Sequence, residues 1–291
     1  MNTILRSSVA EAQISSLGAE LVSFKRTDTG LEYMWSGDAA YWTGRSPVLF
    51  PIIGAARGGE IRVEGQTYKI GNHGFARRRE FTLVDSDGSR AVFLLTSDEN
   101  TLASYPYKFN LFLTYVLSGS RIEISYRVEN ADEGDIFFQI GTHPAFNCPI
   151  GGAGEFSDYY LEFEQQENLE RLFLNKTGQL IRGQADPLLQ GENILPLNHE
   201  MFTGDALVFR NVASRQIALR SKLTSRSVVV TSEGLPDLGV WQPLNAPFLC
   251  IEPWQGVADY DDFTGSLKDK EGAVRLAPGE YHLSSLAIEI N

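Results

Sequence analysis

The stretch NLFLTYVLSGSRIEISYRVEN, residues 110–130, decides the fold class of this chain. In its second half, apolar residues occupy every other position from Ile122 to Val128, and polar or charged residues fill the positions between them. This period of two is typical of a β-strand with one buried face and one solvated face. The turn sequence Ser-Gly-Ser at 118–120 separates it from a similar apolar run, so the stretch predicts an antiparallel hairpin.

The same design recurs along the chain. Residues 61–70 and 81–94 form two further candidate hairpins, each with a glycine at its turn. Later segments such as 227–232 continue the strand pattern, and no long stretch carries an apolar stripe with a period of 3.6 residues. A TIM barrel or a doubly wound sheet would need a helix after most strands. We therefore predict an all-β protein, a large antiparallel β-sandwich with two extended sheets face to face.

The domain organisation follows from the same pattern. The 291 residues include one glycine-rich connection, residues 147–159, that resembles a boundary. Because strand-like segments flank it on both sides, we interpret it as a long loop and the chain as a single domain, 1–291.

Composition narrows the class of partner. With 37 acidic and 25 basic residues, the net charge of −12 disfavours generic binding to nucleic acid or to anionic membranes. The first residues contain no continuous apolar run of a secretion signal, and no later stretch approaches the length of a membrane span. We expect a soluble cytoplasmic protein, monomeric or homodimeric. Its two cysteines, Cys148 and Cys250, are too few for a disulfide scaffold or a thiolate metal site.

Two ionisable residues stand in unusual settings. His143 precedes Pro144, Glu252 precedes Pro253, and we expect each to lie at the end of an apolar strand. Proline forces the preceding residue into an extended conformation, so the direction of both side chains is constrained. This is the pattern of an aimed acid and base, although hydrogen-bonded residues that secure a loop would give the same pattern.

Local surroundings add detail to this pair. Desolvation by the apolar neighbours of Glu252 would raise the pKa of its carboxyl, whereas a nearby cationic histidine or arginine would lower it, and the sequence leaves both outcomes open. A carboxylate whose pKa is raised toward neutral pH is a better general base at that pH. His73, between Asn72 and Gly74, sits in a turn whose glycine permits backbone geometry closed to other residues.

Three motifs in order carry a family resemblance: HGFAR at 73–77, THPAFNCP at 142–149 and IEPW at 251–254. Together they resemble the aldose 1-epimerase, or galactose mutarotase-like, family. SPVLFPIIG at 46–54 and CIEPWQGVAD at 250–259 are most similar to its LacX-like subgroup. The resemblance covers nearly the whole chain and implies a β-supersandwich, which agrees with the strand pattern.

The resemblance also implies a reaction. Glu252 would be the general base that removes the proton of the C1 hydroxyl of a hexose, and His143 the general acid that protonates the ring oxygen. His73 would hydrogen-bond near that oxygen. Ring opening, rotation about C1–C2 and reclosure then interconvert the α and β anomers without a cofactor.

Sugar-binding residues are implied in the same way. Arg57 resembles the family arginine that contacts sugar hydroxyls, although Ala56 stands where the family pattern has asparagine. Asp205 falls where the family places an acidic residue, and Arg77 belongs to the first motif. Phe146, Trp241 and Trp254 are candidates for stacking on the sugar, with the hydrophobic core as the other explanation.

Three alternatives remain open from the sequence. Consecutive arginines at 77–79 suit phosphate, so a hexose-6-phosphate 1-epimerase is the nearest rival, although neighbouring strand side chains alternate faces. A non-catalytic carbohydrate-binding or sugar-sensing protein would need no acid and base. A zinc site made of His73, His143 and either Cys148 or Glu252 is disfavoured because the ligands are scattered, and we expect no metal.

Overall fold

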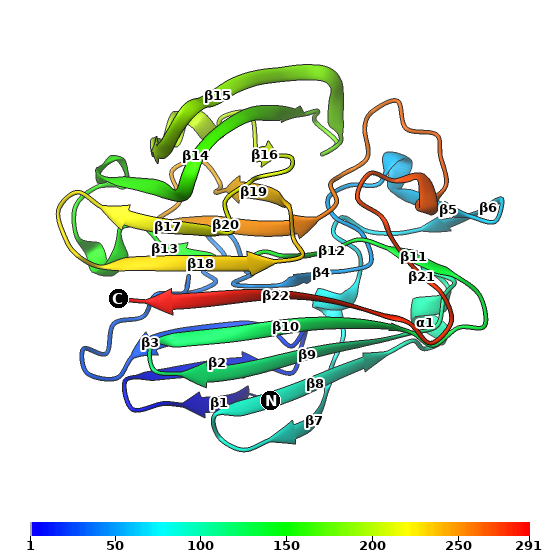
Figure 1. The fold of residues 1–291 in the computed structure, drawn as a ribbon, viewed down its shortest axis with the longest axis horizontal. Helices are drawn as coiled ribbons and strands as arrows, with labels where there is room; N and C mark the ends of the chain where they lie inside the picture. Colours follow the sequence, from blue (N-terminus) through cyan, green and yellow to red (C-terminus); the bar gives the residue numbers. More distant parts are fainter. Residues whose placement is uncertain (1) are drawn as a thin grey trace.

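The structure, a computed structural model, describes residues 2–291 and is built almost entirely of antiparallel strands (Figure 1). A fifteen-stranded sheet runs through most of the molecule. Its strand order is β4 (Val48–Leu49), β12 (Ile140–Thr142), β20 (Phe248–Gln255), β19 (Asp237–Trp241), β16 (Leu207–Phe209), β14 (Tyr159–Leu174), β17 (Gln216–Ser221), β18 (Ser227–Glu233), β22 (Tyr281–Ile290), β10 (Arg121–Asn130), β9 (Phe109–Ser118), β8 (Arg90–Thr96) and β7 (Thr82–Ser86). Outside this order, β13 (Ala145–Asn147) pairs with β20, and β15 (Leu180–Pro196) pairs with β14.

Three smaller sheets complete the fold. They are the sheet of β1 (Asn2–Arg6), β2 (Ala10–Ser15) and β3 (Leu21–Arg26), the pair β5 (Glu60–Val63) and β6 (Gln66–Lys69), and the pair β11 (Ile136–Phe138) and β21 (Val274–Leu276). The helices are short: α1 (Glu99–Leu102) and the 3-10 turns η1 (Arg57–Gly59), η2 (Ala76–Arg78), η3 (Ile150–Gly152), η4 (Phe156–Asp158), η5 (His199–Phe202) and η6 (Leu267–Asp269). Among residues 2–291, no helix is long and apolar enough to cross a membrane.

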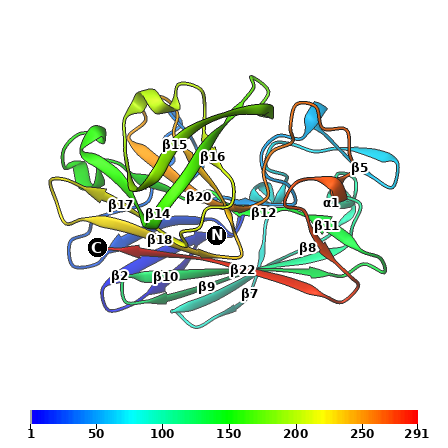
Figure 2. The same ribbon diagram turned by 45° about the horizontal axis from the view of Figure 1, so that its top comes forward.

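The sheets pack face to face, as the alternating pattern predicts. Side chains of β9 and β10 alternate between buried and solvated along most of both strands. Their buried face shares one hydrophobic core with β2 and β3, and Tyr115 donates a hydrogen bond across it to the carbonyl of Ala19 at 2.5 Å. The prediction of an all-β antiparallel sandwich is therefore confirmed (Figures 1 and 2).

All three predicted hairpins form. β9 pairs with β10 around the turn at 118–121, β5 with β6 and β7 with β8. In the second hairpin, Glu64 and Gly65 both have positive φ angles, 49° and 80°, which is the backbone of a tight two-residue turn.

Strand β20 carries the candidate base and lies in the interior of the large sheet. Seven of its eight residues, from Phe248 to Trp254, are buried. On one side it pairs continuously with β19, and on the other it pairs first with β13 and then with β12. Between these two partners, residues 142–144 leave the ladder. This gap is where the functional side chains gather.

Candidate functional site

The candidate site is a cavity of ≈ 360 Å³ at the gap in the β20 ladder. This volume lies within the range of about 300–1,000 Å³ found for small-molecule sites. Seventeen residues from distant parts of the chain line it: Trp42, Ile53, Gly54, Asn72, His73, Arg77, His143, Leu174, Gly178, Leu180, Asp205, Ala206, Val208, Trp241, Glu252, Trp254 and Ala258.

Glu252 enters the cavity from the middle of β20, not from the end of a strand as its position before proline suggested. It pairs with Gly239 of β19, and the strand continues to Gln255. Pro253 is tolerated there because the opposite ladder is interrupted, so its missing N–H leaves no gap in a continuous hydrogen-bond series. Only 1% of the surface of Glu252 is exposed.

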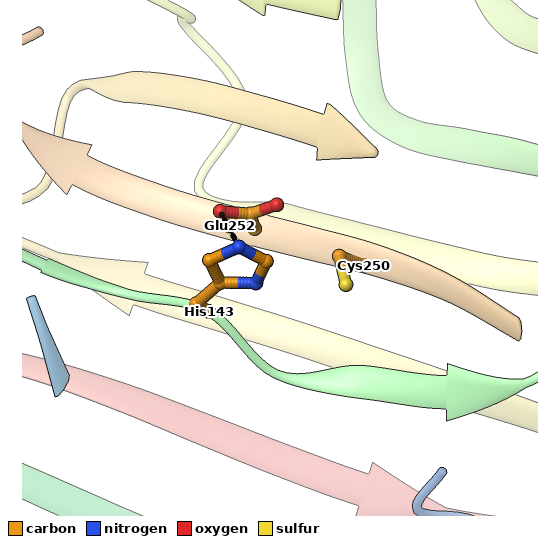
Figure 3. A group of neighbouring side chains, drawn as sticks. All are labelled: His143, Cys250 and Glu252. Carbon is orange, nitrogen blue, oxygen red and sulfur yellow. Dashed lines mark ion pairs between the residues drawn. The ribbon is translucent and has the colours of Figure 1, made fainter. Parts of the chain in front are cut away.

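His143 faces Glu252 from the loop between β12 and β13. Its Nε2 lies 3.3 Å from Oε2 of Glu252, and Figure 3 shows the imidazole directly beside the carboxylate. The two atoms are in contact but are not aligned as a hydrogen bond, so Oε2 keeps its capacity to accept one from a ligand. The structure thus brings the predicted acid and base together.

Burial lowers the pKa of His143 and raises the pKa of Glu252. Desolvation, and secondly the charge of Arg77, lower the pKa of His143 to about 3. Desolvation, and secondly the charge of Asp205, raise the pKa of Glu252 well above its ordinary value. A proton shared by the pair therefore favours the carboxyl group of Glu252 over the imidazole of His143.

His73 is held as a neutral hydrogen-bond donor. It adopts the left-handed backbone conformation with φ of 59°, and its Nδ1 accepts a hydrogen bond from the amide of Gly54 at 3.0 Å. Because Nδ1 is an acceptor, the ring proton is on Nε2. Desolvation, then the neighbouring His143, lower the pKa of His73 well below its ordinary value, so the ring stays neutral. The ring centroids of His73 and His143 are 5.7 Å apart.

The glycine after His73 fixes this geometry. A Cβ at Gly74 would lie 2.2 Å from the carbonyl oxygen of Phe50, and its φ is +68°. Only glycine fits such a position, which accounts for the His-Gly pair of the first motif.

Arg77 is the cation of the cavity. Its guanidinium is anchored by a hydrogen bond of 2.9 Å from Nη2 to the carbonyl of Asn72, while its buried Nε has no protein partner. Asp205 lines the cavity from a left-handed turn with φ of 77°. Oδ1 of Asp205 accepts the amide of Ala206 at 2.9 Å, so its second oxygen and the Nε of Arg77 are the polar atoms open to a ligand.

Trp254 forms a wall of the cavity. Its indole lies over two glycines of the neighbouring strands: a Cβ would be 2.6 Å from the ring at Gly141 and 2.4 Å at Gly239. Its Nε1 donates to the carbonyl of Thr142 at 3.1 Å.

Two predicted binding residues lie outside the cavity. The exposed Arg57 turns its guanidinium to the carbonyl of Phe263 at 3.1 Å. Phe146 is fully buried on β13 and belongs to the main core. We assign neither residue to the site.

Of the polar and aromatic residues that line the cavity, two were not predicted from the sequence. Trp42 stacks on the imidazole of His143 with centroids 4.7 Å apart and an interplanar angle of 24°. Asn72 lines the cavity beside His73. The available signal for Trp42 was a large aromatic residue among turn residues in YWTGRSP, where no strand pattern explains it.

One group of side chains at this site has the spacing of metal ligands. Ligand atoms of His143, Glu252 and Cys250 lie within 4.8 Å of one another, so Cys250 takes the place that Cys148 had in the zinc hypothesis (Figure 3). Desolvation, and secondly Glu252, raise the pKa of the Cys250 thiol, which keeps it protonated and opposes metal binding.

Comparisons with known proteins find relatives along nearly the whole chain. The model of the family described as aldose 1-epimerase matches residues 3–288. "Protein LacX, plasmid" from Lactococcus lactis subsp. lactis is 33% identical over 299 residues, which cover 100% of this chain and 99% of that protein.

Solved structures are similar over the same length. A galactose mutarotase related enzyme from Lactobacillus acidophilus has a TM-score of 0.95 at 30% identity, covering 100% of this chain and 97% of that chain. A galactose mutarotase-like protein from Lactobacillus casei ATCC 334 has a TM-score of 0.91 at 30% identity, with 100% of both chains covered. This chain belongs to the aldose 1-epimerase family and, within it, to the LacX-like proteins.

Proposed function

We propose that this protein is a cofactor-independent aldose 1-epimerase that interconverts the α and β anomers of a free hexose. The observation that carries the proposal is the 3.3 Å contact between His143 Nε2 and Glu252 Oε2 at the wall of a sugar-sized cavity. The C1 hydroxyl and the ring oxygen of a pyranose are both bonded to C1, so two adjacent side chains can reach both oxygens at once.

In the reactive form the shared proton is on His143 and Glu252 is a carboxylate. Glu252 takes the proton of the C1 hydroxyl as His143 gives its proton to the ring oxygen, and the C1–O5 bond breaks to give the aldehyde. The neutral Nε2–H of His73 donates a hydrogen bond toward the ring oxygen. After rotation about C1–C2, the two proton transfers run in reverse and close the ring as the other anomer.

The charges of the cavity favour a free sugar over a sugar phosphate. Among the described residues that line it, Arg77 is the single arginine or lysine, and it shares the space with two carboxylates, Asp205 and Glu252. The other members of the arginine run do not line the cavity; Arg79 lies over the ring of Phe75. A phosphate group would need more cationic partners than this arrangement supplies.

The test of the base is Glu252→Gln, with Glu123→Gln on the exposed face of β10 as matched control. We expect an unchanged fold, retained sugar binding and a loss of about 10²- to 10⁴-fold in the enzymatic rate, because one positioned acid or base typically contributes that much. Interconversion of glucose and galactose anomers, followed by polarimetry or NMR exchange, measures the rate. Near-wild-type activity in Glu252→Gln would remove Glu252 from its role.

His143→Asn is expected to lose activity to a similar extent. The same assay over a panel of aldoses and aldose 6-phosphates separates the candidate substrates. If the protein binds sugars in titrations but accelerates none of them beyond the buffer blank, it is a carbohydrate-binding protein and not an epimerase.

A further inference from the structure

Cys250 is a buried thiol for which the proposed mechanism has no role. It lies on β20 two residues before Glu252, and residues two apart on a strand share a face. Its neighbour across the ladder is β13, at the edge of the gap from which His143 enters the cavity. It is 0% exposed and packs in a small apolar cluster against Trp42 and Trp241. The thiol therefore lies on the side of β20 that faces the catalytic pair.

The imidazole of His143 lies between Glu252 and Cys250. Ligand atoms of the three side chains are within 4.8 Å of one another. Figure 3 shows one ring nitrogen toward the carboxylate and the other on the side of the thiol. The first is Nε2, at 3.3 Å from Oε2 of Glu252, so the second is Nδ1. Nδ1 is buried and has no hydrogen-bond partner among the described residues, in a residue that is only 7% exposed.

The proposed proton transfer requires a hydrogen on Nδ1. Nε2 exchanges the proton with Glu252, so in the neutral ring Nε2 is an acceptor and the ring hydrogen is on Nδ1. When Nε2 takes the proton, the ring becomes a cation and Nδ1 keeps its hydrogen. A buried donor without a partner costs free energy, and a charged one costs more. A partner for Nδ1–H would therefore favour the ring form that takes part in the reaction.

We propose that Cys250 is a positioning residue, whose sulfur accepts the Nδ1 hydrogen of His143 and holds the ring in the tautomer that exchanges protons with Glu252. This inference rests on the proposed epimerase function. A thiol sulfur is a weak but polarizable acceptor, so it can support the ring while it keeps its own hydrogen. Trp42 fixes the plane of the ring by stacking, whereas Cys250 fixes which nitrogen carries the hydrogen.

The experiment compares Cys250→Ala and Cys250→Ser with Cys148→Ala as the matched control. Cys148 is the other cysteine of the chain, is also 0% exposed and does not line the cavity, so its truncation reproduces the loss of packing alone. The backbone of His143 also interacts with its own ring, and it is the same in all these variants.

Two readouts are taken on the whole protein. Selective ¹⁵N labelling of the four histidines, followed by long-range ¹H–¹⁵N correlation spectra, reports the tautomer of each ring. The signals of His143 are identified by their absence in His143→Asn. In parallel, kcat and KM are measured for the anomerisation of glucose and galactose.

We expect His143 to carry its hydrogen on Nδ1 in the wild type, in Cys250→Ser and in Cys148→Ala, and to show a mixture with the Nε2–H form in Cys250→Ala. Cys250→Ala should lower kcat by about tenfold, the value of one hydrogen bond, and change KM by less than about twofold. The hydroxyl of Cys250→Ser should restore most of kcat, because it also accepts a hydrogen bond.

The proposal is overturned if the wild-type ring carries its hydrogen on Nε2, or if Cys250→Ala keeps the wild-type tautomer. It is also overturned if Cys250→Ala loses no more kcat than Cys148→Ala, or if Cys250→Ser loses as much as Cys250→Ala. Absence of anomerisation for every sugar would instead refute the epimerase function, and the tautomer spectra would still decide the role of Cys250.

Discussion

Because His143 and Glu252 are in contact, a single proton can reside on either side chain. A second proton enters His143 only below its pKa of about 3, and the last proton leaves Glu252 only above a pKa that burial has raised. The catalytically competent pair carries one proton, so kcat/KM should fall below about pH 3 and again above the raised pKa of Glu252. Between these limits we expect a plateau.

This pH profile is measured by polarimetry after brief pH jumps, with the buffer-catalysed rate subtracted. Because the charge of Asp205 helps to raise the pKa of Glu252, Asp205→Asn should shift the alkaline limit downward. An acid limit near the ordinary histidine pKa of about 6.5 would show that His143 titrates independently of its burial and contradict the coupled pair.

Ring stacking, not a hydrogen bond, orients His143. Its Nδ1 is buried without a hydrogen-bond partner, whereas Trp42 stacks on one face and Trp241 meets the ring edge-on at 5.6 Å. Trp42→Ala should lower kcat by about 10- to 100-fold, since a misplaced catalytic group costs that much, and should affect KM less. Trp42→Phe retains a stacking ring and should recover most of kcat. Equal loss in both variants, or a change in KM alone, would contradict a positioning role.

Single residues differed in how far the sequence predicted their place. Glu252, His143 and His73 occur in short motifs whose prolines and glycines constrain the local backbone, and the family resemblance of these motifs implied that the three side chains converge. Trp42 reaches the cavity from a loop with no periodic pattern, and its partner His143 is far away in sequence. Arg57 lies outside the cavity, and its position in the sequence could not show this because a backbone position does not tell where a long side chain points.

At the scale of the element, the interruption of one ladder makes the site. β20 exchanges β13 for β12 as its partner across residues 142–144, and His143 is released toward the cavity at that point. The apolar run of β20 could be predicted as a strand, but its change of partner depends on pairing between segments about 100 residues apart. For this reason Glu252 looked like a strand end.

A buried ion pair ties the loop after β20 to η6. The side chains of Lys270 and Asp259 are 1% and 4% exposed and form a salt bridge, and the second oxygen of Asp259 accepts the amide of Arg57 at 2.7 Å. Lys270→Met leaves Asp259 buried without its cation. We expect a loss of about 3–5 kcal/mol in the free energy of unfolding.

Urea unfolding of this variant measures the loss, with the exposed neighbour Lys268→Met as control. The double variant Lys270→Met with Asp259→Asn removes the unpaired charge and should recover part of the stability. An unchanged urea midpoint in Lys270→Met would show that the ion pair adds nothing to the free energy of unfolding.

At the scale of the whole molecule, the sandwich could be predicted but the strand order could not. Alternation reports which face of a strand is buried, and turn residues report the hairpins. Neither reports which distant strands become neighbours, and the order from β4 to β7 mixes early and late segments throughout.

The net charge of −12 gives a prediction about substrate charge. A neutral hexose is not steered by the field of the protein, so kcat/KM for it should be unaffected between low salt and about 0.5 M NaCl. A hexose 6-phosphate approaches against that field, and its kcat/KM should rise with salt. Stopped-flow polarimetry on both substrates makes the comparison. A fall with salt for the phosphosugar would indicate a local cationic site and favour the phosphosugar epimerase.

The place of β22 between β18 and β10 has a consequence for biosynthesis. Arg121 of β10 pairs with Glu289, so the strand that bridges the two halves of the sheet is made long after β10 itself. At about 5–20 residues per second, translation leaves that edge of β10 open for on the order of ten seconds or more. During this interval the nascent chain exposes a long unpaired strand edge, which is a template for aggregation and a binding site for chaperones.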